Sequence, residues 1–124
     1  MVFVVDDDAS VRRGLERLLR SAGYAVVTFA SAREFLERAD CERPGCLVLD
    51  VRMPGPSGLD LYEALINGGH RIPAVFITGH ADGPMAQRAM SMGAVDFLAK
   101  VFDDEIFLGV IAAVFATPPP PSAS

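Results

Sequence analysis

The chain has no tryptophan, only two cysteines, and fewer basic than acidic residues. Cys41 and Cys46 are too few for the disulfide framework of a small secreted domain. With no second pair or nearby histidine they also make no zinc motif, so we expect two free thiols near a loop. Eleven Lys and Arg against 16 Asp and Glu leave a net charge of −5. This acidity disfavours direct nucleic-acid binding and attachment to an anionic membrane.

Long apolar runs are also missing. No run approaches the about 20 residues that span a bilayer, and the N-terminus lacks the basic and apolar regions of a secretory signal. We therefore expect a cytoplasmic protein with no membrane association. What is present is a 51% apolar and 22% charged chain of 124 residues, which is the balance of one folded domain. The proline- and serine-rich residues 117–124 are predicted to be a tail or the start of a linker, which leaves 1–116 as the domain.

Short apolar runs alternate with longer segments of helical period. Such alternation predicts a doubly wound α/β fold, with five parallel strands in the order 2-1-3-4-5 between two layers of helices, a flavodoxin-like sandwich. Ligands bind such sheets at the carboxyl ends of the strands. The predicted strands are about 2–5, 24–29, 46–50, 74–78 and 95–98, and the predicted helices are about 11–22, 31–40, 58–66, 82–93 and 103–115.

Several residues signal where these helices begin and end. Ser31 with Glu34 has the spacing of a capping box, and Ser57 and Asp82 are predicted to cap the third and fourth helices. Gly23 is predicted to end the first helix.

The first helix is predicted to be amphipathic. Asp8 lies where an acid favours the start of a helix. The arginines of this helix are predicted to lie on the face opposite its apolar stripe: Arg12, Arg13, Arg17 and Arg20.

Polar side chains stand at the predicted carboxyl ends of four strands. These are Asp6 and Asp7, Asp50, Thr78 and Lys100. Two carboxylates about 4 Å apart repel by about 4 kcal/mol at an effective dielectric of about 20, so raised pKa values or a bound cation must offset the charge. Oxygen ligands with room for water suit Mg2+. A carboxylate beside a metal and a lysine is also an arrangement suited to phosphoryl transfer and an aspartyl-phosphate.

Four motifs carry these residues. They are V-V-D-D-D at 4–8, L-D-V-R-M-P-G-P-S-G at 49–58, I-T-G-H at 77–80 and G-A-V-D-F-L-A-K at 93–100. In this order and at these strand ends, they resemble the receiver domain of two-component response regulators. The D-V-R-M-P and T-G-H motifs are most similar to the nitrogen-fixation regulator type. The resemblance covers residues 2 to about 116.

This resemblance implies a role for each polar residue. Asp50 would accept a phosphoryl group from a sensor histidine kinase, with Mg2+ as cofactor. The protein would then be a signalling domain with no enzymatic activity beyond its own phosphorylation and dephosphorylation. The resemblance implies that the metal is bound by Asp6, Asp7, Asp50 and the Arg52 carbonyl. It implies that the phosphoryl group is handled by Asp50, Thr78 and Lys100. The implied conformational switch consists of Thr78 and Phe97.

One position departs from the family pattern. The family usually has a cis proline after the lysine, and this chain has Val101. A cis bond before valine costs about 2.5–4 kcal/mol, so we expect a trans bond and a Lys100 farther from Asp50 than in the family.

We expect the signal to leave the domain through a change of the surface formed by the predicted helix 82–93, strand 95–98 and helix 103–115. This surface would act on a partner or an output domain. The last of these segments is more apolar than one buried stripe requires, which favours a homodimer through this face.

Three alternative functions stay open. A degenerate receiver would act only as a protein-interaction module. An aspartate-nucleophile phosphatase usually has a second acid two residues after its nucleophile, where this chain has Arg52. A flavodoxin-like flavin site needs a Ser-, Thr- or Gly-rich loop after the first strand, and this chain has three acids there.

Overall fold

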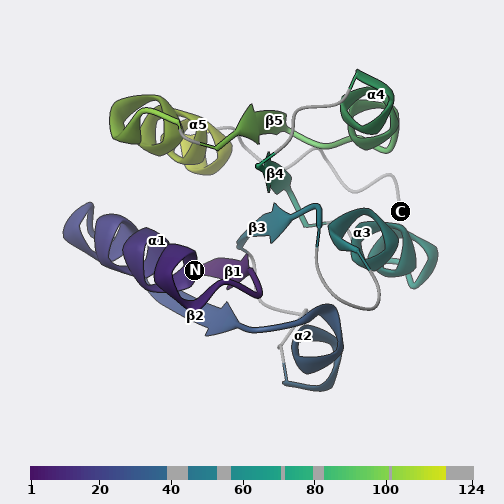
Figure 1. Cartoon of the computed structure of the whole chain (residues 1–124), viewed down its shortest axis with the longest axis horizontal. Coiled ribbons are helices and arrows are strands. Elements are labelled where there is room, and N and C mark those ends of the chain that lie inside the picture. The colour runs from purple at the N-terminus through teal and green to yellow at the C-terminus, as the bar shows by residue number, and fades with distance from the viewer. Residues whose placement is uncertain (39–44, 53–56, 71, 80–82, 101, 117–124) are drawn as a thin grey trace.

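The computed structural model describes residues 1–38, 45–52, 57–70, 72–79, 83–100 and 102–116. Its centre is a five-stranded parallel sheet in the order β2-β1-β3-β4-β5 (Figure 1). This confirms the predicted fold class and strand order. The strands are β1 (Val2–Val5), β2 (Val26–Phe29), β3 (Cys46–Asp50), β4 (Ala74–Thr78) and β5 (Asp96–Ala99).

Helices cover both faces of the sheet, α1 and α5 on one and α2, α3 and α4 on the other (Figure 1). No helix in the described part of the chain is long and apolar enough to cross a membrane. The helices are α1 (Ala9–Ser21), α2 (Ala32–Arg38), α3 (Gly58–Asn67), α4 (Gly83–Ser91) and α5 (Asp104–Ala116).

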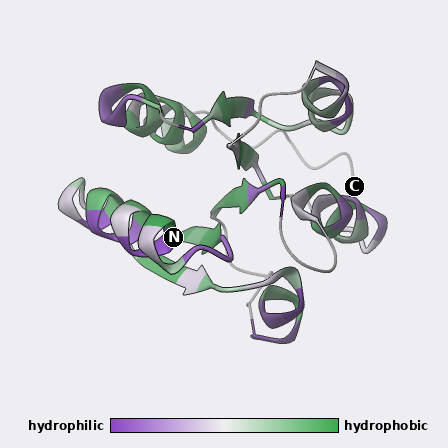
Figure 2. Cartoon of the chain, in the orientation of Figure 1, coloured by the Kyte–Doolittle hydropathy of each residue, from purple (hydrophilic) through white to green (hydrophobic). Residues whose placement is uncertain are grey.

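The sheet separates two hydrophobic clusters. Residues of β1, β3 and β4 are buried throughout, because helices lie on both sides of them, and the strands are accordingly apolar along most of their length (Figure 2). Phe35 and Phe76 belong to the cluster beneath α2, α3 and α4, and Leu19 and Phe107 to the one beneath α1 and α5. Packing on both sides holds the carboxyl ends of β1, β3 and β4 in fixed positions.

The end of α1 explains why β2 starts later than predicted. Gly23 follows α1 with a φ of 94°, and the N–H of Tyr24 donates to the carbonyl of Leu19, which is a Schellman turn. This turn uses the residues before Val26, so β2 begins two residues later than predicted. The predicted role of Gly23 as a helix stop is confirmed.

The capping predictions are confirmed at α3 and in part at α2. Ser57 and Asp60 form a complete capping box at the start of α3. At α2 the N–H of Glu34 donates to Ser31 Oγ, but the Glu34 carboxylate accepts from the N–H of Ala30 rather than that of Ser31. The predictions on Cys41, Asp82, Val101 and 117–124 concern positions outside the described residues.

Cys46 is a free thiol, as predicted, and it lies at the buried start of β3. Burial raises the pKa of its thiol to about 12. Since the thiolate is the reactive form, this cysteine is a structural residue of the core.

Candidate functional site

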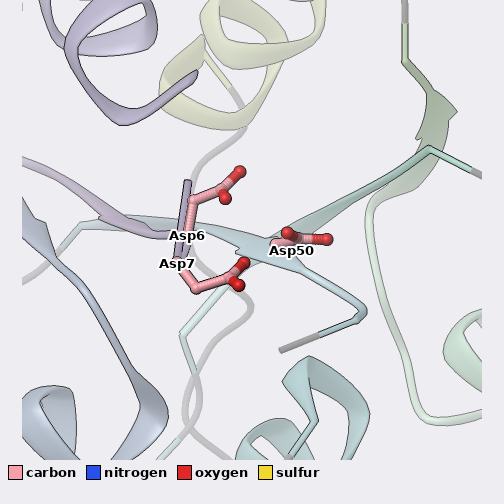
Figure 3. A group of neighbouring side chains, drawn as sticks. All are labelled: Asp6, Asp7 and Asp50. Carbon is pink, nitrogen blue, oxygen red and sulfur yellow. The ribbon is translucent and has the colours of Figure 1, made fainter. Parts of the chain in front are cut away.

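The sheet brings three carboxylates together at its carboxyl edge. β1 and β3 are neighbours, so Asp6 and Asp7 after β1 lie beside Asp50 at the end of β3 (Figure 3). One carboxylate oxygen from each lies within 4.8 Å of the others. Asp6 and Asp50 are buried, whereas Asp7 is exposed. The predicted acidic cluster therefore exists, with one open side.

Lys100 forms ion pairs with two acids of this cluster. It follows β5, and its Nζ lies 3.2 Å from Asp6 Oδ2 and 3.4 Å from Asp50 Oδ2. Its backbone N–H donates to the carbonyl of Thr78 over 2.6 Å, which ties the end of β5 to the end of β4. One ammonium is thus shared by two buried carboxylates.

This charge imbalance shifts the ionisation of the site. Burial and the negative charge of Asp6 outweigh the lowering effect of Lys100 and together raise the pKa of the Asp50 carboxyl from 3.8 to about 6. Burial lowers the pKa of Lys100, but the charges of the two acids outweigh it and raise that pKa overall. Asp50 therefore carries its charge at neutral pH at a free-energy cost.

The loop between β1 and α1 is organised by its own side chains. Asp8 caps α1 by accepting from the N–H groups of Ser10 and Val11, as its position at the helix start predicted. The N–H of Asp8 donates to Asp6 Oδ1 over 2.9 Å. Arg12 does not lie on the outward face as predicted: it is half-buried, and its Nη1 donates to the Asp6 carbonyl over 2.7 Å.

The other predicted residues also lie around this edge. Thr78 is fully buried at the end of β4. Arg52 is exposed, and its N–H donates to Asp50 Oδ1 over 3.2 Å, so its backbone lies next to the acidic cluster. Phe97 is half-buried, with its ring centroid 6.4 Å from that of Phe76.

Lys100 contacts Asp50 at ion-pair distance, so valine at position 101 does not remove the lysine from the cluster. The geometry of the Lys100–Val101 bond itself lies outside the described residues.

Close packing holds the backbone after β3. The N–H of Gly58 donates to the carbonyl of Val51, and a Cβ at Gly58 would collide with the carbonyl oxygen of Asp50. Only glycine allows the start of α3 to approach the end of β3 this closely.

The donor set fits a hard divalent cation. Three carboxylates supply oxygen ligands, one of them exposed, which leaves room for water, and the cluster has an uncompensated negative charge. Mg2+ is bound in proteins by a few carboxylates with several retained waters.

Comparison with known proteins agrees with this geometry. Residues 2–112 match the response regulator receiver domain. The chain belongs to this family. The receiver domain is 53% identical over 113 residues to nodulation protein W of Bradyrhizobium diazoefficiens, covering 91% of this chain and 50% of that protein. It is 45% identical over 119 residues to response regulator protein TodT of Pseudomonas putida, covering 96% and 52%.

Solved structures show the same receiver fold. The amino-terminal structure of FixJ superposes with a TM-score of 0.86 at 41% identity, covering 96% of this chain and 95% of that one. Response regulator StyR superposes with a TM-score of 0.87 at 54% identity, covering 93% and 58%. The similarity to FixJ confirms the predicted resemblance to nitrogen-fixation regulators. The receiver spans about half the length of the curated relatives it matches.

The receiver is thus a signalling domain of two-component systems, a family that generally binds Mg2+ at its acidic cluster. The predicted acids and lysine come together in one site. The sequence-based prediction missed the contact of Arg12 with the Asp6 carbonyl, because the helical period favoured an outward position for this arginine.

Proposed function

We propose that Asp50 accepts a phosphoryl group from the phosphohistidine of a sensor kinase and later loses it to water. The observation that carries this proposal is the contact of the buried Asp50 carboxylate with Lys100, beside Asp6 and Asp7 at an open edge of the sheet. A carboxylate held there is a nucleophile with positive charge at hand for the incoming phosphoryl oxygens.

In the transfer, an oxygen of Asp50 forms a bond to phosphorus while the phosphorus–nitrogen bond of the phosphohistidine breaks. The electron pair of that bond stays with the imidazole. In the later dephosphorylation, water attacks phosphorus, the bond to Asp50 breaks, and the Asp50 carboxylate and inorganic phosphate are released. Lys100 stays paired with the phosphoryl charge, and the Thr78 hydroxyl turns toward the phosphoryl group.

Mg2+ would be held by Asp7 and Asp50 directly, by the Arg52 carbonyl, and by Asp6 through water. Bound there, it supplies positive charge to the phosphoryl oxygens. The exposure of Asp7 supports a direct ligand role, because that carboxylate faces the open side of the cluster. The Asp6 carboxylate already contacts Lys100 and the Asp8 N–H, which supports a ligand role through water for Asp6.

The output surface in this proposal is the face of α4, β5 and α5, which changes when Thr78 and Phe97 move. Apolar side chains of α4 and α5 are exposed, among them Met90 at 48% and Ile106 at 58%. Much of the apolar excess of α5 is used within the domain, since Phe107 and Ile111 are buried. The exposed remainder supports a homodimer or a docked partner through this face, with the kinase as the other partner.

The test is intact mass after incubation with Mg2+ and acetyl phosphate. The wild type should gain one hydroxylamine-labile phosphoryl group, and Asp50→Asn should gain none. Asp60→Asn, which changes an exposed acid in α3, is the matched control and should react like the wild type. A wild type with no gain is a degenerate receiver, and an Asp50→Asn variant with a normal gain moves the acceptor elsewhere. Light scattering before and after phosphorylation tests the homodimer.

A further inference from the structure

Arg12 makes a contact with the acidic loop that its neighbours on α1 do not make. Its Nη1 donates to the Asp6 carbonyl over 2.7 Å. That carbonyl belongs to the peptide that joins Asp6 to Asp7. The guanidinium is half-buried, one turn after the Asp8 cap, whereas Arg13 is exposed. Arg12 therefore holds the backbone between two acids of the site.

Other contacts in the loop act on different groups. The Asp6 carboxylate is held by Lys100 through Oδ2 and by the Asp8 N–H through Oδ1. The second bond also closes a turn around the Asp6–Asp7 peptide, but neither bond engages the carbonyl of that peptide, which Arg12 holds. Among the described residues, no hydrogen bond or ion pair holds the exposed Asp7 carboxylate, so the backbone, which fixes its Cα–Cβ bond, sets the space that the carboxylate can reach.

We infer that Arg12 is a positioning residue for Asp7. By fixing the Asp6–Asp7 peptide, it aims the Asp7 carboxylate at the space shared with Asp50, where one oxygen of each already lies within 4.8 Å of the other. This inference rests on the proposed use of that space by Mg2+. Groups that orient metal ligands typically change metal affinity by about 10–100-fold when they are removed.

The sign of the effect separates this role from simple electrostatics. Arg12 is a cation near a cation site, so removing its charge alone should strengthen Mg2+ binding. Removing a hydrogen bond that aims a ligand should weaken it. The two explanations predict opposite changes for the same substitution.

The experiment is a titration of the metal-free protein with Mg2+, followed by backbone amide NMR shifts of the residues after β1 and β3. Arg12→Met should raise the Kd for Mg2+ about tenfold, and Arg12→Lys, which keeps a donor and the charge, should stay within about threefold of the wild type. Arg13→Met, one residue along the same helix, is the matched control and should change the Kd less than twofold.

The outcomes separate this inference from the proposed function. Unchanged or tighter binding by Arg12→Met overturns the positioning role and leaves the proposed function standing. An Arg12→Lys variant as weak as Arg12→Met also overturns it, since the hydrogen bond was not the cause. A wild type with no saturable Mg2+ shift overturns the proposed metal site and the inference with it. If Arg12→Met does not fold, Arg12→Gln replaces it and the same tenfold weakening is required.

Discussion

Replacing Asp50 by asparagine should make the metal-free protein more stable at neutral pH. Asp50 is only 4% exposed, and it shares a single lysine with the equally buried Asp6. Two carboxylates against one ammonium leave a buried negative charge without compensation. Asparagine keeps the shape and can still accept the bond from the Arg52 N–H, but it carries no charge.

The magnitude follows from the pKa of Asp50. Burial, with a further contribution from Asp6, raises this pKa from 3.8 to about 6. Between these two values the folded protein binds a proton at Asp50 that the unfolded chain does not, so the contribution of Asp50 to stability rises as the pH falls from about 6 to about 4. Above pH 6 the folded state carries the full cost, about 3 kcal/mol for a shift of this size. At pH 7.5 the Asn variant should gain up to that amount, or about 10 °C in Tm, and near pH 4 the difference should vanish.

Urea unfolding in EDTA at several pH values between 4 and 7.5 measures this difference. Asp60→Asn is the control of opposite sign. Its bonds with Ser57 lower the pKa of Asp60, so that acid stabilises the fold above its unfolded pKa, and the effect is lost as the pH falls. Asp60→Asn should therefore be less stable than the wild type at pH 7.5. An Asp50→Asn variant that is less stable than the wild type at pH 7.5, or whose advantage does not change with pH, would refute the reasoning.

Three further predictions concern the same edge of the sheet. Mg2+ at 10 mM should raise the wild-type Tm by about 5 °C if the Kd is about 1 mM, and Asp7→Ala should lose most of this shift in a thermal melt; an equal shift in both proteins would place the ion elsewhere. Lys100→Met should lower the free energy of unfolding at pH 7 by about 2–3 kcal/mol in urea, and by less near pH 5, because the two buried acids lose their shared cation. A loss independent of pH would point to packing instead. Gly58→Ala should cost about 2–3 kcal/mol in the same assay, because its Cβ would collide with the Asp50 carbonyl; a neutral effect would mean that the start of α3 moves freely.

The parts of the fold and site that depend on local pattern could be predicted from the sequence. Apolar runs such as Val2–Val5 and Cys46–Asp50 gave strands with the predicted bounds, because a strand buried on both faces is apolar throughout. The strand order then placed Asp6 and Asp50 side by side, although nothing in their own neighbourhoods relates them. Ser57 was predictable as a cap because its side chain bonds within its own turn.

The details that depend on distant contacts could not be predicted. The sequence indicated that the acids and Lys100 would gather and that pKa values could rise, but not that Asp50 has the raised pKa or that Lys100 also contacts Asp6, 94 positions away. Arg12 was misplaced because a helical period describes where a side chain leaves the helix and not where a long side chain ends. In the first turns of α1 the guanidinium reaches back to a carbonyl in the preceding loop.

The loop after β1 has a consequence for which changes of length the chain tolerates. Three successive acids there have three different neighbours: Asp6 contacts Lys100, Asp7 faces the open side of the site, and Asp8 caps α1. Surface loops usually accept insertions and deletions easily. Here a single added or deleted residue would shift each acid into the position of the next one, so that each would lose its own contacts. The local composition would hardly change. This turn should therefore be among the least tolerant positions of the domain to a change in length, while substitutions that keep its spacing are far less disruptive.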